Sequence, residues 1–143
     1  MKRTISRIKA LIILYHDDLM KNELLEEEKN EIDVLLKEGV ENLEYDEKFF
    51  NEIVEGVRNN LATIDRLIAI SLTKYTIDRL SYVDRALIRI GTYELKYTNT
   101  PKNIIINEII NLSHDYSEIE GFDSAKFNNA LLEKISNRIE NGK

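Results

Sequence analysis

The sequence predicts an all-α domain, a compact bundle of about seven helices. Apolar residues recur every three or four positions through nearly the whole chain, which is the spacing of one face of a helix. No stretch of useful length alternates apolar and polar residues as a half-buried strand does. The 143 residues contain no Cys and fit one domain, whose core can support the fold without a disulfide or a structural metal.

Two helices are expected in the first 40 residues. The first is about four turns long, and Thr4 or Ser6 is expected to cap it. A polar, acidic stretch over 21–30 separates it from a second, short helix, which Gly39 ends. The apolar faces of these two helices consist of Ile5, Ile8, Leu11, Ile12, Tyr15 and Leu19, and of Ile32, Leu35 and Leu36.

Asp46 is expected to cap a third helix, because its carboxylate can accept the unpaired amide hydrogens of the first turn. A fourth helix is expected over 61–75. Their buried faces consist of Phe49, Phe50, Ile53, Val54 and Val57, and of Ile64, Leu67, Ile68 and Leu72.

A fifth helix is expected to start at a capping box, in which Ser81 and Asp84 each satisfy a backbone donor of the other. Glu94 falls on its apolar face and therefore needs a partner. We expect Glu94 and Glu108 to join a buried polar network with Arg85 and Arg89. The apolar face consists of Val83, Ala86, Leu87, Ile90 and Tyr97.

Thr100 and Pro101 are expected to cap and open a sixth helix that runs to about Tyr116. This helix is apolar over most of its circumference, which predicts that it is the central one. Asp123 or Ser124 is expected to cap the last helix, whose apolar face consists of Phe127, Ala130, Leu131 and Ile135.

Charge is distributed unevenly along the chain. The net charge is −6, yet residues 1–16 carry +4, residues 17–57 carry −11 and residues 58–143 carry +1. A basic N-terminal arm beside an acidic body can meet an anion at one place and a cationic partner at another. The alternative is a solvated acidic face next to a basic terminus.

Composition excludes several kinds of site. Without Cys there is no iron-sulfur cluster, cysteine zinc site or thiolate nucleophile, and two separated His leave little for a metal site. The five Gly stand far apart, so no phosphate-binding Gly-rich loop exists, and neither a Gly-x-Ser-x-Gly elbow nor a His-Glu-x-x-His motif occurs. We therefore expect no catalytic residue, metal or cofactor.

The longest apolar run near the start, residues 10–15, is six residues long, whereas a bilayer requires roughly 20. The basic opening also lacks the small-residue cleavage site of a secretory signal. These features predict no membrane association and a cytoplasmic location.

Three ordered blocks resemble the NusB family of bacterial transcription antitermination factors. Residues 50–57 and the combination of Arg7 with Leu14 and Tyr15 agree more loosely. The three blocks read VDRALIRI at 83–90 followed by YEL at 93–95, INEIINL at 106–112, and DSAKFNNALLEK at 123–134. The resemblance covers nearly the whole chain and predicts a single NusB-like domain over 1–143, with helical subdomains at about 1–60 and 61–143.

The resemblance implies a non-catalytic factor that pairs with the small-subunit ribosomal protein NusE and binds boxA RNA in nascent ribosomal transcripts. The complex also implies indirect contact with other Nus factors and RNA polymerase. By holding boxA to the elongating polymerase, it is expected to suppress premature termination. The charge map agrees with such a complex, because an acidic body can dock a basic protein and form a composite RNA surface with it.

The resemblance also implies roles for individual residues. The residues that match positions near the family's RNA surface are Arg7, Tyr15, Lys126 and Phe127. Lys2 and Arg3 are added to these candidates because they belong to the basic N-terminal arm. Tyr15 and Phe127 could equally be core aromatics. The helical wheel places the Arg7 guanidinium at the edge of the apolar stripe, where it is expected to reach phosphate.

Asp78 and Asp84 match acidic positions that face the ribosomal protein in the family, and Asp84 is expected to cap its helix as well. The chain departs from the family in its uncharged Thr4, Ile5 and Ser6, and in Asn128 and Ala130 in place of the common Val and Gly. Two alternatives are an RNA-binding domain related to those of ribosomal RNA cytosine methyltransferases and a purely structural helical homodimer.

Overall fold

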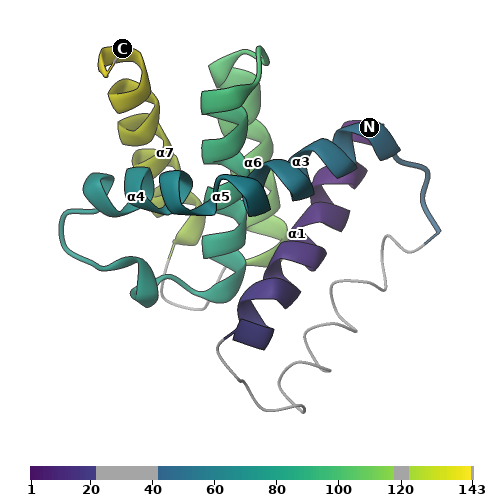
Figure 1. Cartoon of the computed structure of the whole chain (residues 1–143), viewed down its shortest axis with the longest axis horizontal. Helices are drawn as coiled ribbons and strands as arrows, with labels where there is room; N and C mark the ends of the chain where they lie inside the picture. Colours follow the sequence, from purple (N-terminus) through teal and green to yellow (C-terminus); the bar gives the residue numbers. More distant parts are fainter. Residues whose placement is uncertain (22–41, 118–122, 143) are drawn as a thin grey trace.

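A computed structural model describes residues 1–21, 42–117 and 123–142 (Figure 1). This part of the chain folds into six α-helices and one short 3-10 helix, without a strand, which confirms the all-α prediction. The expected short helix around Leu35, with Ile32, Leu36 and Gly39, lies outside the described residues. The elements are α1 (Lys2–Lys21), α3 (Glu47–Asn59), α4 (Leu61–Ser71), η1 (Ile77–Arg79), α5 (Tyr82–Tyr97), α6 (Lys102–Tyr116) and α7 (Ser124–Asn141).

The central helix is α5, which packs against α1, α3, α4, α6 and α7. The prediction that the helix over 102–116 is central is wrong, since α6 packs mainly on α5 and α7 and leaves Ile104 48% exposed. The reason lies in composition: α5 buries Asp84, Arg85 and Glu94 by pairing them with other side chains. The number of apolar residues in α5 therefore underestimates how deeply this helix is buried.

Several helix boundaries follow from local hydrogen bonds. The Asp46 carboxylate accepts from the Phe49 amide at 3.0 Å, and the Asp123 carboxylate accepts from the Lys126 amide at 2.9 Å, so both predicted caps are confirmed. The predicted caps of the first helix are wrong, because α1 already begins at Lys2. Ser6 is instead buried and joins α1 to α3: its hydroxyl donates to the Asp46 carbonyl at 2.8 Å and accepts from the Asp46 amide at 2.9 Å.

Other boundaries and faces differ from the sequence pattern. The fourth helix ends at Ser71, not near residue 75, because Leu72 turns to extended backbone while still packing against the core. Pro101 occupies the N-cap position of α6, and no side chain caps that helix. On α5, Val83 is only half-buried and Tyr97 is 40% exposed, so the buried face stops at Glu94.

The crossing of α3 and α5 depends on Gly56. A Cβ atom placed at this position would overlap the ring of Tyr93. We expect Gly56→Ala to lower the free energy of unfolding by about 1–3 kcal/mol through overpacking, although Ala favours a helix by about 1 kcal/mol over Gly. In a Tyr93→Ala background the same substitution should stabilise the protein. Urea unfolding of the four proteins tests this, and an equal loss in both backgrounds would contradict it.

None of the helices in the described ranges combines the length and the apolar character needed to cross a membrane.

Candidate functional site

The basic residues that open α1 have different environments. Lys2 and Arg3 are exposed, and the Arg3 guanidinium lies 4.3 Å from the centre of the Phe49 ring. The Lys2 ammonium is 3.7 Å from the carboxylate of Glu44, and both side chains are mostly in solvent. Water screens such a pair strongly, so Lys2 and Arg3 remain available to an anion.

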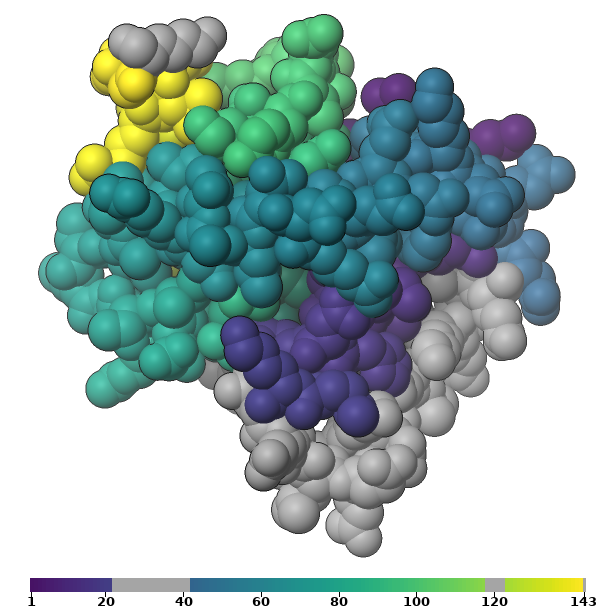
Figure 2. All heavy atoms as spheres, viewed as in Figure 1, coloured from purple at the N-terminus to yellow at the C-terminus, as the bar shows by residue number. Residues whose placement is uncertain are grey.

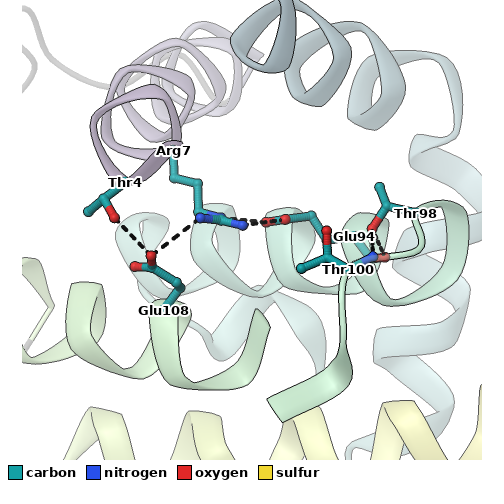
Figure 3. Close-up of polar contacts among 6 residues, drawn as sticks. All are labelled: Thr4, Arg7, Glu94, Thr98, Thr100 and Glu108. Carbon is teal, nitrogen blue, oxygen red and sulfur yellow. Dashed lines mark hydrogen bonds and ion pairs between the residues drawn. The ribbon is translucent and has the colours of Figure 1, made fainter. Parts of the chain in front are cut away.

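Arg7, one helical turn after Arg3, is only 2% exposed. Its Nε and Nη2 atoms donate to the two carboxylate oxygens of Glu94 at 2.8 and 2.7 Å (Figure 3). Its Nη1 lies 3.5 Å from Glu108 Oε1, an atom that also accepts from the Thr4 hydroxyl at 2.8 Å. A bidentate pair of this kind holds both groups in a fixed orientation.

Two predictions about this cluster are therefore wrong. The Arg7 guanidinium is not free at the edge of the stripe, because α1 is covered by both α3 and α5 and its edge lies inside the interface. Glu94 does have the partner it needed, but that partner is Arg7 and not Arg85 or Arg89. Thr4, Arg7, Glu94 and Glu108 form what we call the Arg7 cluster.

Arg85 and Arg89 belong to a second charged cluster on the other side of α5. Arg85 Nε lies 2.8 Å from Asp18 Oδ2, and Arg89 Nη1 lies 3.4 Å from the same oxygen. Arg89 also donates two hydrogen bonds of 2.8 Å to the carboxylate of Asp65. Asp18 has no role predicted from the sequence, although this residue stands in the acidic end of the first helix.

Tyr15 lies in the core. Its side chain is 1% exposed, and its ring meets the Tyr82 ring edge-on, with centroids 6.4 Å apart. The structure thus places Tyr15 among the core aromatics, without an open face on which a base could stack.

The start of α7 presents the other two predicted RNA residues. Lys126 is exposed, whereas Phe127 is half-buried and meets the Tyr75 ring edge-on at 5.9 Å. Figure 1 shows the starts of α1 and α7 on opposite sides of the view, so the predicted residues do not form one patch. Tyr75 was missed by sequence reasoning, because it follows the end of α4 and was expected inside that helix.

The two predicted partner residues also separate. The Asp78 side chain is 90% exposed and lies 3.8 Å from Arg85 Nη1. Asp84 is 4% exposed and its carboxylate accepts from Asn128 Nδ2 at 2.9 Å, so the prediction that it faces a partner is wrong. Ser81 does accept from the Asp84 amide at 3.1 Å, but the Asp84 carboxylate binds α7 and does not complete the capping box.

A chain of hydrogen bonds fixes the start of α7. Asn128 Nδ2 also donates to the Ser113 hydroxyl at 3.0 Å, and the Ser124 hydroxyl donates to the Ser117 carbonyl at 3.1 Å. All four side chains are buried. Asp84 and Asn128 therefore hold the turn of α7 that carries Lys126 and Phe127. In the part of the chain that the structure describes, no three His, Asp or Glu side chains could jointly hold a metal ion.

Comparisons with known proteins agree on one family. The sequence model of the NusB family matches residues 4–137. The transcription antitermination protein NusB of Fervidobacterium nodosum is 44% identical over 88 residues, which are 61% of this chain and 60% of that protein. The protein of the same name from Halalkalibacterium halodurans is 34% identical over 135 residues, which are 94% of this chain and 92% of that protein.

Solved structures share the fold. NusB of T. maritima has a TM-score of 0.68 and 28% identity, over 96% of this chain and 93% of that one. A crystal structure of the antitermination factors NusB and NusE in complex with dsRNA contains a chain with a TM-score of 0.70 and 24% identity. That alignment covers 94% of this chain and 95% of the other, and at this identity it shows the fold alone.

Proposed function

The chain belongs to the NusB family, and we propose that it is a transcription antitermination factor that binds boxA RNA of nascent ribosomal transcripts together with the ribosomal protein NusE. The observation that carries this proposal is the family match over residues 4–137. In this proposal the protein is not an enzyme, and it acts in the cytoplasm, where other Nus factors join it on RNA polymerase.

The proposed RNA surface has two separate parts, at the starts of α1 and α7, and its residues are exposed except for the half-buried Phe127. Lys2 and Arg3 attract phosphate at the start of α1, and Lys126 does so at the start of α7, where Phe127 offers aromatic surface. Arg7 and Tyr15 act behind this surface, since their burial sets the position of α1.

The proposed partner surface centres on Asp78. Its carboxylate lies in η1, within the α4–α5 connection, and is almost fully in solvent, so it can pair with a basic group of NusE. Asp84 supports the RNA surface from inside, because its bond to Asn128 holds the start of α7.

The two-subdomain organisation is part of the same proposal. Asn60 is both the C-cap of α3 and the N-cap of α4, and its side-chain amide donates to the Gly56 carbonyl at 2.8 Å. The break between the proposed subdomains falls at this residue, with α1 and α3 before it.

RNA titrations with and without NusE test the function. We expect weak, salt-dependent boxA binding by the protein alone and at least tenfold tighter binding with NusE, because a net charge of −6 opposes RNA until a basic partner is docked. Asp78→Lys should remove most of the gain from NusE and leave binding by the protein alone unchanged or slightly tighter. Equal affinity with and without NusE would contradict the proposal.

A further inference from the structure

A continuous groove runs between α4 and α7, away from the Arg7 cluster. Figure 2 shows side chains of α7 (yellow) directly beside those of α4 (teal), and the two helices are in contact. Two hollows of about 300 and 710 Å³ follow this contact and share Ser71, Thr73 and Lys134 as lining residues. We call the combined surface the α4/α7 groove.

The charge of the groove is opposite to that of the whole chain. Lys74, Lys134 and Arg138 line it, and no carboxylate is among the residues that line either hollow. Within the described residues these three cations form no ion pair. By contrast, Lys102 of α6 is paired with Glu133 of α7 at 3.1 Å. Three unpaired cations in one groove of a protein with net charge −6 favour an anionic occupant.

One end of the groove is aromatic. Tyr75 is 47% exposed and meets Phe127 edge-on, and Phe127 follows Lys126 in the first turn of α7. An exposed ring beside a row of cations is the combination by which proteins hold single-stranded nucleic acid: bases stack on the ring, and the cations follow the phosphates. An acidic peptide would use the cations but would leave the Tyr75 ring without a stacking partner.

We propose that the α4/α7 groove binds the single-stranded RNA that flanks boxA, with a base on Tyr75 and consecutive phosphates on Lys74, Lys134 and Arg138. This inference rests on the proposed function, because it extends the RNA path from the start of α7 along that helix. The groove adds affinity without reading sequence, since phosphate contacts position RNA but do not specify it.

The test compares two RNAs in the presence of NusE. The short RNA is boxA alone, about 12 nucleotides long, and the long RNA adds about nine flanking nucleotides on each side. We expect a Lys74→Gln, Lys134→Gln, Arg138→Gln variant to bind the long RNA at least tenfold more weakly. Its salt slope should fall by about two units, because each phosphate contact contributes about 0.7 for a single strand. Binding of the short RNA should not change.

Matched variants separate this surface from net charge. A Lys21→Gln, Lys48→Gln, Lys96→Gln variant removes three exposed cations outside the groove and should bind the long RNA at least threefold more tightly than the groove variant. Tyr75→Ala should weaken long-RNA binding by about fivefold or more, and Tyr75→Phe should restore it, because both rings stack. The altered side chains are solvent-exposed, so the melting temperatures should stay near that of the parent.

The outcomes distinguish the groove from the underlying function. If the parent protein binds neither RNA with NusE, the proposed function fails. If the parent binds both and the groove variant matches it on the long RNA, only the groove proposal is overturned. The groove proposal would also be overturned if the groove variant bound NusE more weakly while the assembled complex of that variant with NusE bound the long RNA as tightly as the parent complex does. That result would identify the groove as a protein interface.

Discussion

Arg7→Ala is expected to lower the free energy of unfolding by about 3–5 kcal/mol, because it leaves a buried carboxylate without its cation. Glu94 is 0% exposed, and both of its oxygens accept from Arg7 at 2.7 and 2.8 Å. Glu108 is 25% exposed and can regain water, so most of the loss comes from Glu94. Urea unfolding at neutral pH measures the effect.

Arg3→Ala is the matched control. Arg3 lies one turn earlier on the same helix, and its guanidinium lies 4.3 Å from the centre of the Phe49 ring, as that of Arg7 does at 4.9 Å, but the Arg3 side chain is in solvent. An exposed cation-π contact is worth about 0.5–1 kcal/mol, so the control should lose no more than that.

A double variant shows whether the pair or its volume matters. Arg7→Met with Glu94→Met should recover most of the stability lost in Arg7→Ala, because replacing both members of a buried pair by apolar groups is often neutral.

The salt slope of RNA binding by folded Arg7→Ala should equal that of the parent, since the guanidinium is buried and cannot reach phosphate. A stable Arg7→Ala with a reduced slope would contradict the structure.

The local parts of the fold were predictable from sequence because they depend on neighbouring residues. The apolar stripe of α1 and the Asp46 cap each involve groups within one or two turns. The environment of Arg7 was not predictable in this way. A helical wheel gives the angle of a side chain on its own helix, but it does not say that α3 and α5 cover α1 from two sides.

The choice of partners shows the same limit. An isolated Glu on an apolar face correctly predicted a buried ion pair, since a buried charge must be compensated. Arg85 and Arg89 were chosen because they lie near Glu94 in sequence, whereas the true partner, Arg7, is 87 residues away. Arg7, Arg85 and Arg89 could each have been assigned to Glu94, and only the packing of α1 on α5 selects Arg7.

The Tyr75 and Phe127 contact is also non-local, and it depends on where α4 ends. Leu72 continues the apolar spacing of α4, so the pattern extended the helix to residue 75. At Leu72 the backbone is instead extended, so the helix ends there and the chain continues toward η1. This path places Tyr75 in contact with Phe127 of α7. An apolar residue that anchors a loop has the same sequence signature as one that continues a helix.

Asp17 and Asp18, neighbours at the end of α1, should differ sharply in their effect on stability. Asp18→Ala should lower the free energy of unfolding by about 3 kcal/mol or more, because it removes the close counter-ion of Arg85. That guanidinium is 8% exposed, and among the residues that the structure describes it would keep only the Asp78 carboxylate, which is 3.8 Å away and mostly in water. Arg89 is less affected, since Asp65 still binds it through two hydrogen bonds.

Asp17→Ala removes an ion pair, with Arg58, whose geometry is equally good but which is exposed to solvent. Asp17 accepts from Arg58 at 2.7 and 2.9 Å, and these hydrogen bonds raise the pKa of the Arg58 guanidinium, but the side chains are 42% and 50% exposed. We expect a loss below about 1 kcal/mol, which should vanish near 1 M salt, where the screening length is about 3 Å. The loss in Asp18→Ala should persist at that salt concentration, because the buried pair is shielded from counter-ions. Denaturant titrations of both variants at low and high salt decide between these cases, and equal, salt-sensitive losses would mean that water reaches Asp18 and Arg85 as freely as it reaches Asp17.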